Sequence, residues 1–128
     1  MGKIYITDIR HCKQVPDAKA YAIVRSLKNP ITGVTQLPEL SPSKNLFFAY
    51  LDLKKAGKWD REAFDAIYTP RFLSEMQAPE AKAALSRIAK EAETDDIVLC
   101  CFCSDKLCHR FLVADILQKE YGADIVIA

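Results

Sequence analysis

The chain has 128 residues, half of them hydrophobic, and a formal net charge of +1. This length and composition predict one domain over residues 1–128, large enough to bury its own core. A net charge near zero gives no general argument for nucleic-acid binding, although it leaves a local basic patch open. No run of about 18 apolar residues occurs, so we expect no membrane-spanning helix. The first residues also lack the apolar core of a signal peptide.

Two strands are predicted near the start of the chain. Isoleucines alternate with other residues over 3–8, which is typical of a strand. Residues 20–25 are predicted as a strand rather than a short helix, because Tyr, Ile and Val favour strands. Asn29 and Pro30, together with a glycine and two further prolines, then predict a long loop that continues to Ser43.

Four helices are predicted in the middle of the chain. Ser43 can cap a helix over 44–55, which a nearby glycine ends. Asp60 can cap the next helix, and Pro70 and Pro79 occupy the first positions of two more. In the last three of these helices, the residues predicted to face inward are Ala63, Phe64, Ile67 and Tyr68, then Phe72, Leu73 and Met76, and then Ala81, Ala84, Leu85, Ile88 and Ala89.

The end of the chain predicts a strand–helix–strand unit. Residues 97–102 form an apolar run typical of a central strand covered on both faces. A helix follows to about Tyr121, with Ser104 or Asp105 as its N-cap, and 124–127 is a final strand. Such a unit is parallel and right-handed. The sequence therefore predicts an α/β fold: a small three-layer structure with a mostly parallel sheet and helices on both faces.

The cysteines are clustered. Four of the five lie between residues 100 and 108. In a strand, Cys101 and Cys103 share a face about 7 Å apart, too far for an easy disulfide, and Cys100 points to the other face. An odd, clustered set fits reduced thiols in a cytoplasmic protein better than a disulfide framework.

The first turn of the last helix carries the other candidate residues. The helix has an apolar stripe formed by Leu112, Val113, Ile116 and Leu117. Continued backwards, the stripe runs through Cys108 and His109, so we expect both to face the strand end, with Arg110 at the edge of the stripe. A strand end, a short loop and a helix N-terminus together favour the binding of an anion.

These positions predict a thiol site. Cys101 and Cys108 are candidate catalytic thiols, because positive charge and a helix N-terminus favour the thiolate; the alternative is two small buried core residues. His109 is either a general acid or base or a core histidine bonded to a carbonyl. If Arg25 and Arg110 both border the strand ends, they would clamp an anion. The lysine and arginine run over 54–61 is most simply a solvated face.

A metal site is an alternative use of the same residues. Cys101, Cys103, Cys108 and His109 offer thiolate and imidazole ligands suited to Zn or Fe. Adjacent residues on a helix point about 100° apart, which makes convergence of all four difficult. The sequence specifies no cofactor and no oligomeric state.

The Cys108-His109-Arg110 segment, on a helix that follows a strand with a cysteine, resembles the bacterial domain-of-unknown-function family 488. An arginine near the end of the second strand, here Arg25, is a further resemblance to the family. Many members have Glu where Cys103 stands, and their loop is a residue longer, so no role of that acid carries over. The family has no settled activity, and the resemblance implies the fold and the position of the site. Weaker resemblances are the segment 40–46 and the aromatic region with Trp59, Phe64, Tyr68 and Leu73.

Three function hypotheses follow from these patterns. The first is an enzyme whose thiol- and arginine-lined site takes a small anionic or nucleotide-like substrate. The second is a non-catalytic module that binds a ligand or a metal ion such as Zn or Fe. The third is association with nucleic acid, which only scattered Lys and Arg residues support.

Overall fold

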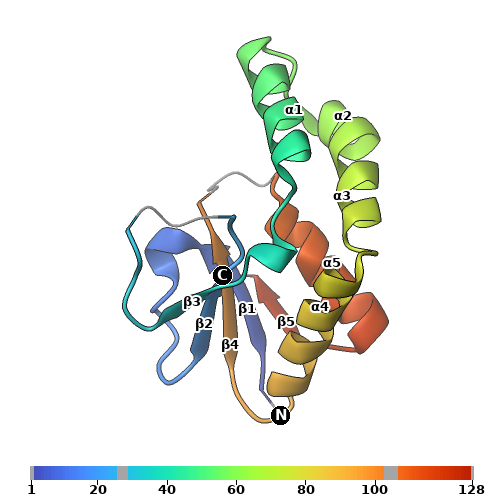
Figure 1. Cartoon of the computed structure of the whole chain (residues 1–128). Coiled ribbons are helices and arrows are strands. Elements are labelled where there is room, and N and C mark those ends of the chain that lie inside the picture. Colours follow the sequence, from blue (N-terminus) through green and yellow to red (C-terminus); the bar gives the residue numbers. More distant parts are fainter. Residues whose placement is uncertain (1, 26–28, 103–106, 128) are drawn as a thin grey trace.

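The computed structural model describes residues 2–25, 29–102 and 107–127 (Figure 1). Five strands form one sheet in the order β3-β2-β4-β1-β5, and every pair of neighbouring strands is parallel. This arrangement confirms the predicted α/β class with a mostly parallel sheet. The strands are β1 Ile4–Asp8, β2 Lys19–Ala22, β3 Val34–Gln36, β4 Ile97–Cys101 and β5 Ile125–Ile127.

The helices divide into two groups. Helices α4 and α5 pack against each other, and α5 contacts β1 and β4. Helices α1, α2 and α3 rise beyond one end of the sheet and form an arm (Figure 1). The helical segments are η1 Ile9–His11, η2 Pro38–Leu40, α1 Lys44–Lys55, α2 Arg61–Ala63, η3 Phe64–Tyr68, α3 Thr69–Glu75, α4 Pro79–Glu91 and α5 His109–Tyr121.

Strand β4 lies at the centre of the sheet, and all five of its residues are buried. Because side chains alternate along a strand, Cys101 faces α5 while Cys100 faces the other side of the sheet. On that second side the connection between β1 and β2 contributes the short helix η1, which contacts β4. The predicted burial of the central strand on both faces is therefore confirmed.

Two features of the strands differ from the prediction. Strand β2 ends at Ala22 instead of Arg25, because Ile23 donates to Cys100 O but turns its own carbonyl toward His109. Strand β3 was not predicted at all, since its three residues fall inside the loop expected to run to Ser43. It is an edge strand with little buried side-chain area, so its sequence has no apolar pattern to detect.

The helices predicted around Tyr68 are joined rather than separate. Residues 64–68 form a π-helical turn in which Thr69 N–H donates to Phe64 O, and α3 continues directly from it. The wider turn changes which residues face inward. Phe64, Tyr68, Phe72 and Met76 are buried as predicted, but Ile67 and Leu73 are exposed by 43% and 39%.

Several predicted helix ends are confirmed. Ser43 Oγ accepts from Leu46 N–H at the start of α1, and Asp60 accepts from Ala63 N–H at the start of α2. Gly122 ends α5 in the left-handed conformation that glycine adopts without strain. No helix within the described ranges combines the length and apolar character needed to cross a membrane.

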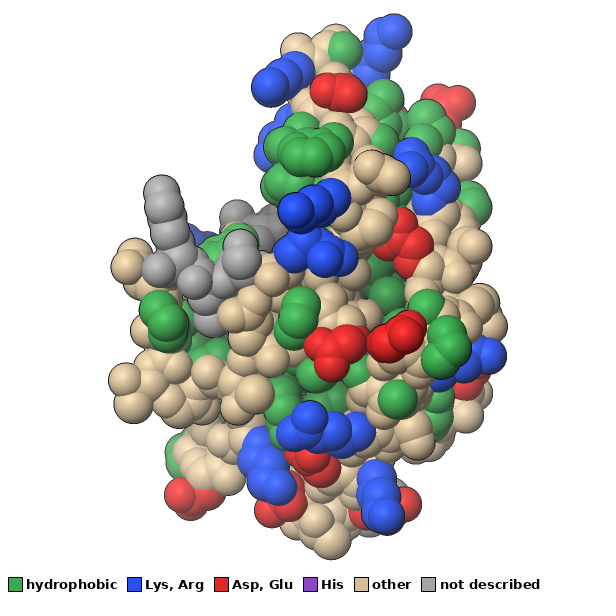
Figure 2. Space-filling view, in the orientation of Figure 1, with side chains coloured by type: hydrophobic (Ala, Val, Ile, Leu, Met, Phe, Trp, Pro, Cys, Tyr) green, Lys and Arg blue, Asp and Glu red, His purple; other side chains and the backbone are tan. Residues whose placement is uncertain are grey.

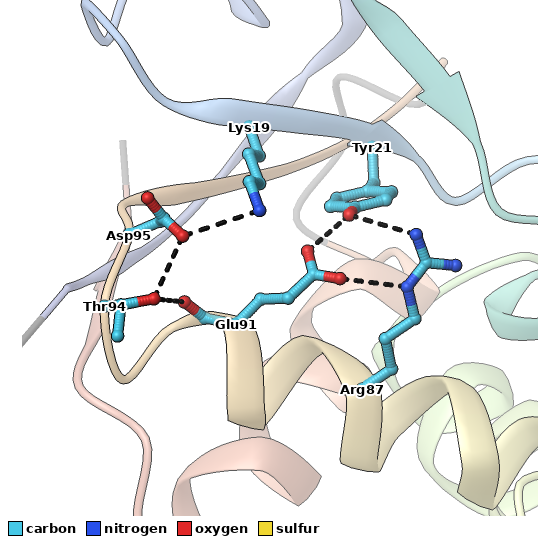
Figure 3. A network of polar contacts seen from close by, with 6 residues as sticks. All are labelled: Lys19, Tyr21, Arg87, Glu91, Thr94 and Asp95. Atoms are coloured by element: carbon cyan, nitrogen blue, oxygen red, sulfur yellow. Dashed lines mark hydrogen bonds and ion pairs between the residues drawn. The ribbon is translucent and has the colours of Figure 1, made fainter.

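A polar network attaches α4 to the sheet (Figure 3). Tyr21 on β2 donates its hydroxyl to Glu91 on α4, and Arg87 Nε donates to the same carboxylate at 2.9 Å. Burial alone would raise the pKa of Glu91, but the hydrogen bonds from Tyr21 and Arg87 outweigh it and lower the pKa below its usual value of 4.5. The carboxylate form is therefore favoured by folding.

We predict that this network makes the free energy of unfolding depend on acid pH. Because the folded pKa of Glu91 is lowered, its contribution is complete above the unfolded value and is lost as pH falls through the folded value. Glu91→Gln should lower the free energy of unfolding by about 1 kcal/mol at neutral pH and flatten its dependence on pH below about 4.5. Denaturant titrations at several pH values measure both effects. The exposed Glu93→Gln is the matched control, and equal profiles for the two variants would contradict the assignment.

Candidate functional site

The candidate site lies where β4 ends and α5 begins. Cys101 is the last residue of β4, and Cys108 is the N-cap residue of α5. The prediction of Ser104 or Asp105 as N-cap is wrong, because α5 begins at His109; both residues lie outside the described ranges. The later start brings the Cys108 sulfur to the end of β4 instead of placing it inside the first helical turn.

Two sulfurs form the centre of the site. Cys101 Sγ and Cys108 Sγ lie 3.0 Å apart, and the side chains are buried. Arg110 Nη1 donates to Cys101 Sγ at 3.3 Å. Cys101 is thus in contact with both a second thiol and a guanidinium group, and the contact with the cation favours its thiolate form.

Arg110 is buried, with 7% of its surface exposed, which a position at the edge of the helix stripe did not by itself predict. The guanidinium lies 4.6 Å from the centre of the Phe111 ring, so a cation–π contact accompanies the contact with sulfur. Burial works against the charge of Arg110, but interactions with Cys101 and Cys108 outweigh it and raise the pKa of the arginine. Arg110 therefore remains a cation at any pH the protein meets.

His109 is held in one orientation. Its Nε2 donates to Ile23 O at 2.8 Å, since a carbonyl only accepts. The neutral ring then presents Nδ1 as an acceptor, and Cys108 Sγ lies 3.7 Å from it. Burial lowers the pKa of His109 to about 4, and the charge of Arg110 acts in the same direction. His109 is therefore a neutral acceptor at neutral pH, in contrast to Arg110.

A cavity of about 890 Å³ opens onto the two thiols. Cys101, Cys108 and His109 line one side of it, and α1, the segment before α2, and η3 provide aromatic side chains on another. In Figure 2, hydrophobic side chains and Lys or Arg side chains gather together on the surface over α1. The cavity is thus lined by reactive, aromatic and cationic groups together. The aromatic and cationic members are Phe47, Phe48, Tyr50, Trp59, Tyr68, Phe102, Arg25, Lys44 and Lys54.

Arg25 borders this cavity at an exposed position. Its Nε and Nη2 both donate to Pro42 O, at 3.1 and 3.0 Å, which fixes the guanidinium against the segment before α1. Arg110 instead lies behind Cys101 and is not among the described residues that line the cavity. The two arginines thus occupy different places, one at the rim and one beneath the sulfur.

Cys100, on the other face of β4, has a different environment from Cys101. It is fully buried and its Sγ lies 3.5 Å from Tyr21 O. Burial, followed by the nearby thiols of Cys12 and Cys101, raises the pKa of Cys100 to about 12. All four described cysteines are thiols. Cys103 lies outside the described residues, and the reduced state of all five cysteines in the native protein stays a prediction.

The ligand atoms of Cys101, Cys108 and His109 lie within 4.8 Å of one another, which brings together three of the four predicted metal ligands. Two thiolates on one tetrahedral zinc, each about 2.3 Å from the ion, would place their sulfurs about 3.8 Å apart. The observed separation is 3.0 Å, and the Arg110 cation already contacts one sulfur. This arrangement fits two thiols that share a proton better than two ligands of a metal ion.

The cavity wall on α1 was not predicted. The lysine run was interpreted as a solvated face, yet Lys54 lines the cavity. Phe47 and Phe48 are 44% and 56% exposed, so α1 carries more apolar surface than its own packing uses. The sequence signal for this wall was the pair of consecutive aromatic residues on a lysine-rich helix. The sequence did not show that the fold places this helix opposite Cys101.

The fold and the site together define a small parallel α/β protein with a buried thiol pair and an arginine at the carboxyl end of its central strand. The family model DUF488-N3a, described as the active DUF488-N3 subclade, matches residues 9–121. The chain therefore belongs to this family, in agreement with the resemblance of its Cys-His-Arg segment. No curated protein and no solved structure matches the chain.

We predict that Arg110 controls the reactivity of Cys101. Iodoacetamide should modify Cys101 and Cys108 faster than Cys100 at neutral pH, because the pKa of Cys100 is about 12 and little of it is thiolate. Arg110→Gln should slow the modification of Cys101 about tenfold, through loss of a charge-assisted hydrogen bond. Mass spectrometry with peptide fragmentation gives the rate at each cysteine. Unchanged rates at Cys101 in Arg110→Gln would show that the thiol pair is a packing feature.

Proposed function

We propose that the protein is a cytoplasmic, thiol-dependent enzyme that acts on a small anionic or nucleotide-like substrate. The proposal depends chiefly on one observation, the contact between Arg110 and Cys101 beside a second thiol at the edge of a large cavity. A thiolate is a strong nucleophile, and a cationic neighbour keeps a cysteine in that form near neutral pH. Membership of the family leaves the reaction open.

Cys101 is the proposed nucleophile. Its sulfur forms a bond to an electrophilic atom of the substrate, and the bond from that atom to the leaving group breaks with its electron pair. Cys108, 3.0 Å from Cys101 Sγ, supplies the proton that the leaving group needs. Arg110 stabilises the thiolate before attack and so acts through Cys101, although the sequence suggested it as an anion ligand.

His109 has a positioning role in this proposal. Its bond to Ile23 O fixes the ring, and its free acceptor faces the Cys108 sulfur. Since the pKa of His109 is about 4, the ring is neutral and receives a hydrogen bond from the Cys108 thiol instead of pairing with it as a cation. That bond orients the Cys108 thiol beside Cys101.

The lining of the cavity supports the substrate class. Arg25, Lys44 and Lys54 offer positive charge to a phosphate or carboxylate. Phe47 and Trp59 offer aromatic surface on which a planar ring can stack. Aromatic surface beside cationic side chains is the combination that binds a nucleobase together with its phosphate.

Ligand protection tests this proposal. Adenosine monophosphate and inorganic phosphate should each slow the modification of Cys101 by iodoacetamide, whereas uncharged adenosine should protect less. Arg25→Gln should weaken the protection by adenosine monophosphate about tenfold, the value of one charged hydrogen bond. Both probes are small enough for a cavity of about 890 Å³.

Two neighbouring lysines provide a matched control. Lys54 lines the cavity, and the exposed Lys55 is not among its described lining residues. Lys54→Gln should weaken protection, and Lys55→Gln should leave it unchanged. Equal modification rates with and without both anionic probes would contradict the proposed substrate class. Equal effects of the two lysine variants would contradict the assigned cavity.

A second candidate function is a metal-binding module, which the proximity of Cys101, Cys108 and His109 favours. Binding would require the two sulfurs to separate and His109 to turn Nδ1 toward the ion. Elemental analysis of the purified protein separates the two functions. About one equivalent of zinc, lost in Cys108→Ser, would favour the module, because structural zinc needs its full ligand set.

A further inference from the structure

We infer that Cys101 and Cys108 are a reversible modification site, at which a hydroperoxide converts the thiol pair into a disulfide. The inference concerns regulation of the thiol site, and the loss of activity that it predicts rests on the proposed function. The oxidation itself is argued from three features of the structure: a short distance between two sulfurs, a cation beside one of them, and a cavity through which a small oxidant can reach them.

The geometry requires little movement. A disulfide holds its sulfurs about 2.05 Å apart, and the two Sγ atoms are already 3.0 Å apart. They must therefore approach by about 1 Å. Cys108 is the N-cap residue, and only its backbone carbonyl, not its side chain, caps α5, so the side chain can turn without breaking the helix.

The charges select Cys101 as the residue attacked first. Arg110 Nη1 contacts Cys101 Sγ, and the thiolate that it favours is the form that reacts with peroxides. Of the described cysteines, Cys101 and Cys108 line the cavity, while Cys100 contacts Cys12 on the other face of β4. Because both cavity thiols are almost fully buried, a small oxidant has better access to them than a protein disulfide.

The reaction proceeds in two balanced steps. The Cys101 thiolate attacks one oxygen of the hydroperoxide, the O–O bond breaks, and the products are a sulfenic acid on Cys101 and, after protonation, water or an alcohol. Cys108 then attacks the Cys101 sulfur, the S–OH bond breaks, and hydroxide leaves and takes the Cys108 proton as water. Two electrons pass from the thiol pair to the peroxide, and His109 Nδ1, 3.7 Å from Cys108 Sγ, is placed to assist the proton transfer.

The disulfide would stop the proposed enzymatic chemistry, because it consumes the nucleophile and its proton donor together. It would also protect Cys101 from further oxidation to sulfinic acid, which most proteins cannot reverse. A thiol reductant restores both groups by exchange. The expected behaviour is therefore reversible inactivation.

The test uses the whole protein, hydrogen peroxide and tryptic mapping under non-reducing conditions. Trypsin cleaves after Lys106 and Arg110, so Cys101 falls in peptide 91–106 and Cys108 in peptide 107–110. We expect a cross-link between these peptides and a fall from five titratable thiols to three, both reversed by dithiothreitol. Because 91–106 also carries Cys100 and Cys103, the double variant Cys100→Ser, Cys103→Ser should keep the cross-link, and Cys101→Ser should lose it.

Cys108→Ser provides a second readout, because it leaves the sulfenic acid of Cys101 without its thiol partner for trapping by a 1,3-diketone. Arg110→Gln should slow cross-linking about tenfold, in proportion to the loss of thiolate. A cross-link that survives in Cys101→Ser would overturn the inference. Irreversible oxidation of Cys101 without a cross-link would also overturn it. In that case, iodoacetamide reactivity and anion protection of the unoxidised protein would still support the proposed function. Slow reaction of Cys101 with both reagents would overturn both proposals.

Discussion

The buried guanidinium of Arg110 is the constraint on which the site depends. A guanidinium keeps its proton in a protein, and a buried cation without compensating negative charge is strongly destabilising. Among the described residues, the thiols of Cys101 and Cys108 interact with Arg110, and Cys101 Sγ accepts a hydrogen bond from it directly. His109 is neutral at neutral pH and so cannot offset the charge of Arg110. In the proposed account, Arg110 therefore favours the thiolate form of Cys101 through their direct contact.

The cavity beside the thiols also depends on the arm formed by α1, α2 and α3. A chain of aromatic contacts runs from Tyr50 and Trp59, whose ring centres are 4.7 Å apart, through Tyr68 and Phe72 to His109. Glu75 on α3 accepts from the backbone and hydroxyl of Ser43, which ties α3 to the start of α1. These contacts hold the aromatic and cationic wall of the cavity opposite the thiols. A change in the arm would thus alter the lining of the cavity without touching Cys101.

Much of the fold was predictable because it depends on local patterns. The apolar run of β4, the Ser43 and Asp60 caps and the left-handed Gly122 all act within a few residues. The segment 108–110 likewise predicted where the candidate site would lie, next to the end of β4. The features that the sequence did not predict depend on contacts between residues far apart in the chain. They are the carbonyl of Ile23 that ends β2 early, the burial of Arg110, and the contact of α1 with the cavity. The π-helical turn before α3 also escaped prediction, since it changes the helical period on which inward faces were assigned.

Ultraviolet titration of the Cys101 thiolate tests the central claim most directly. The absorbance difference between the native protein and Cys101→Ser, followed against pH, isolates this sulfur. If Arg110 holds Cys101 as a thiolate, the difference should persist well below pH 8.5, the usual value for a free cysteine, and Arg110→Gln should shift its midpoint upward. A midpoint at or above that of a free cysteine, with no change in Arg110→Gln, would contradict the account.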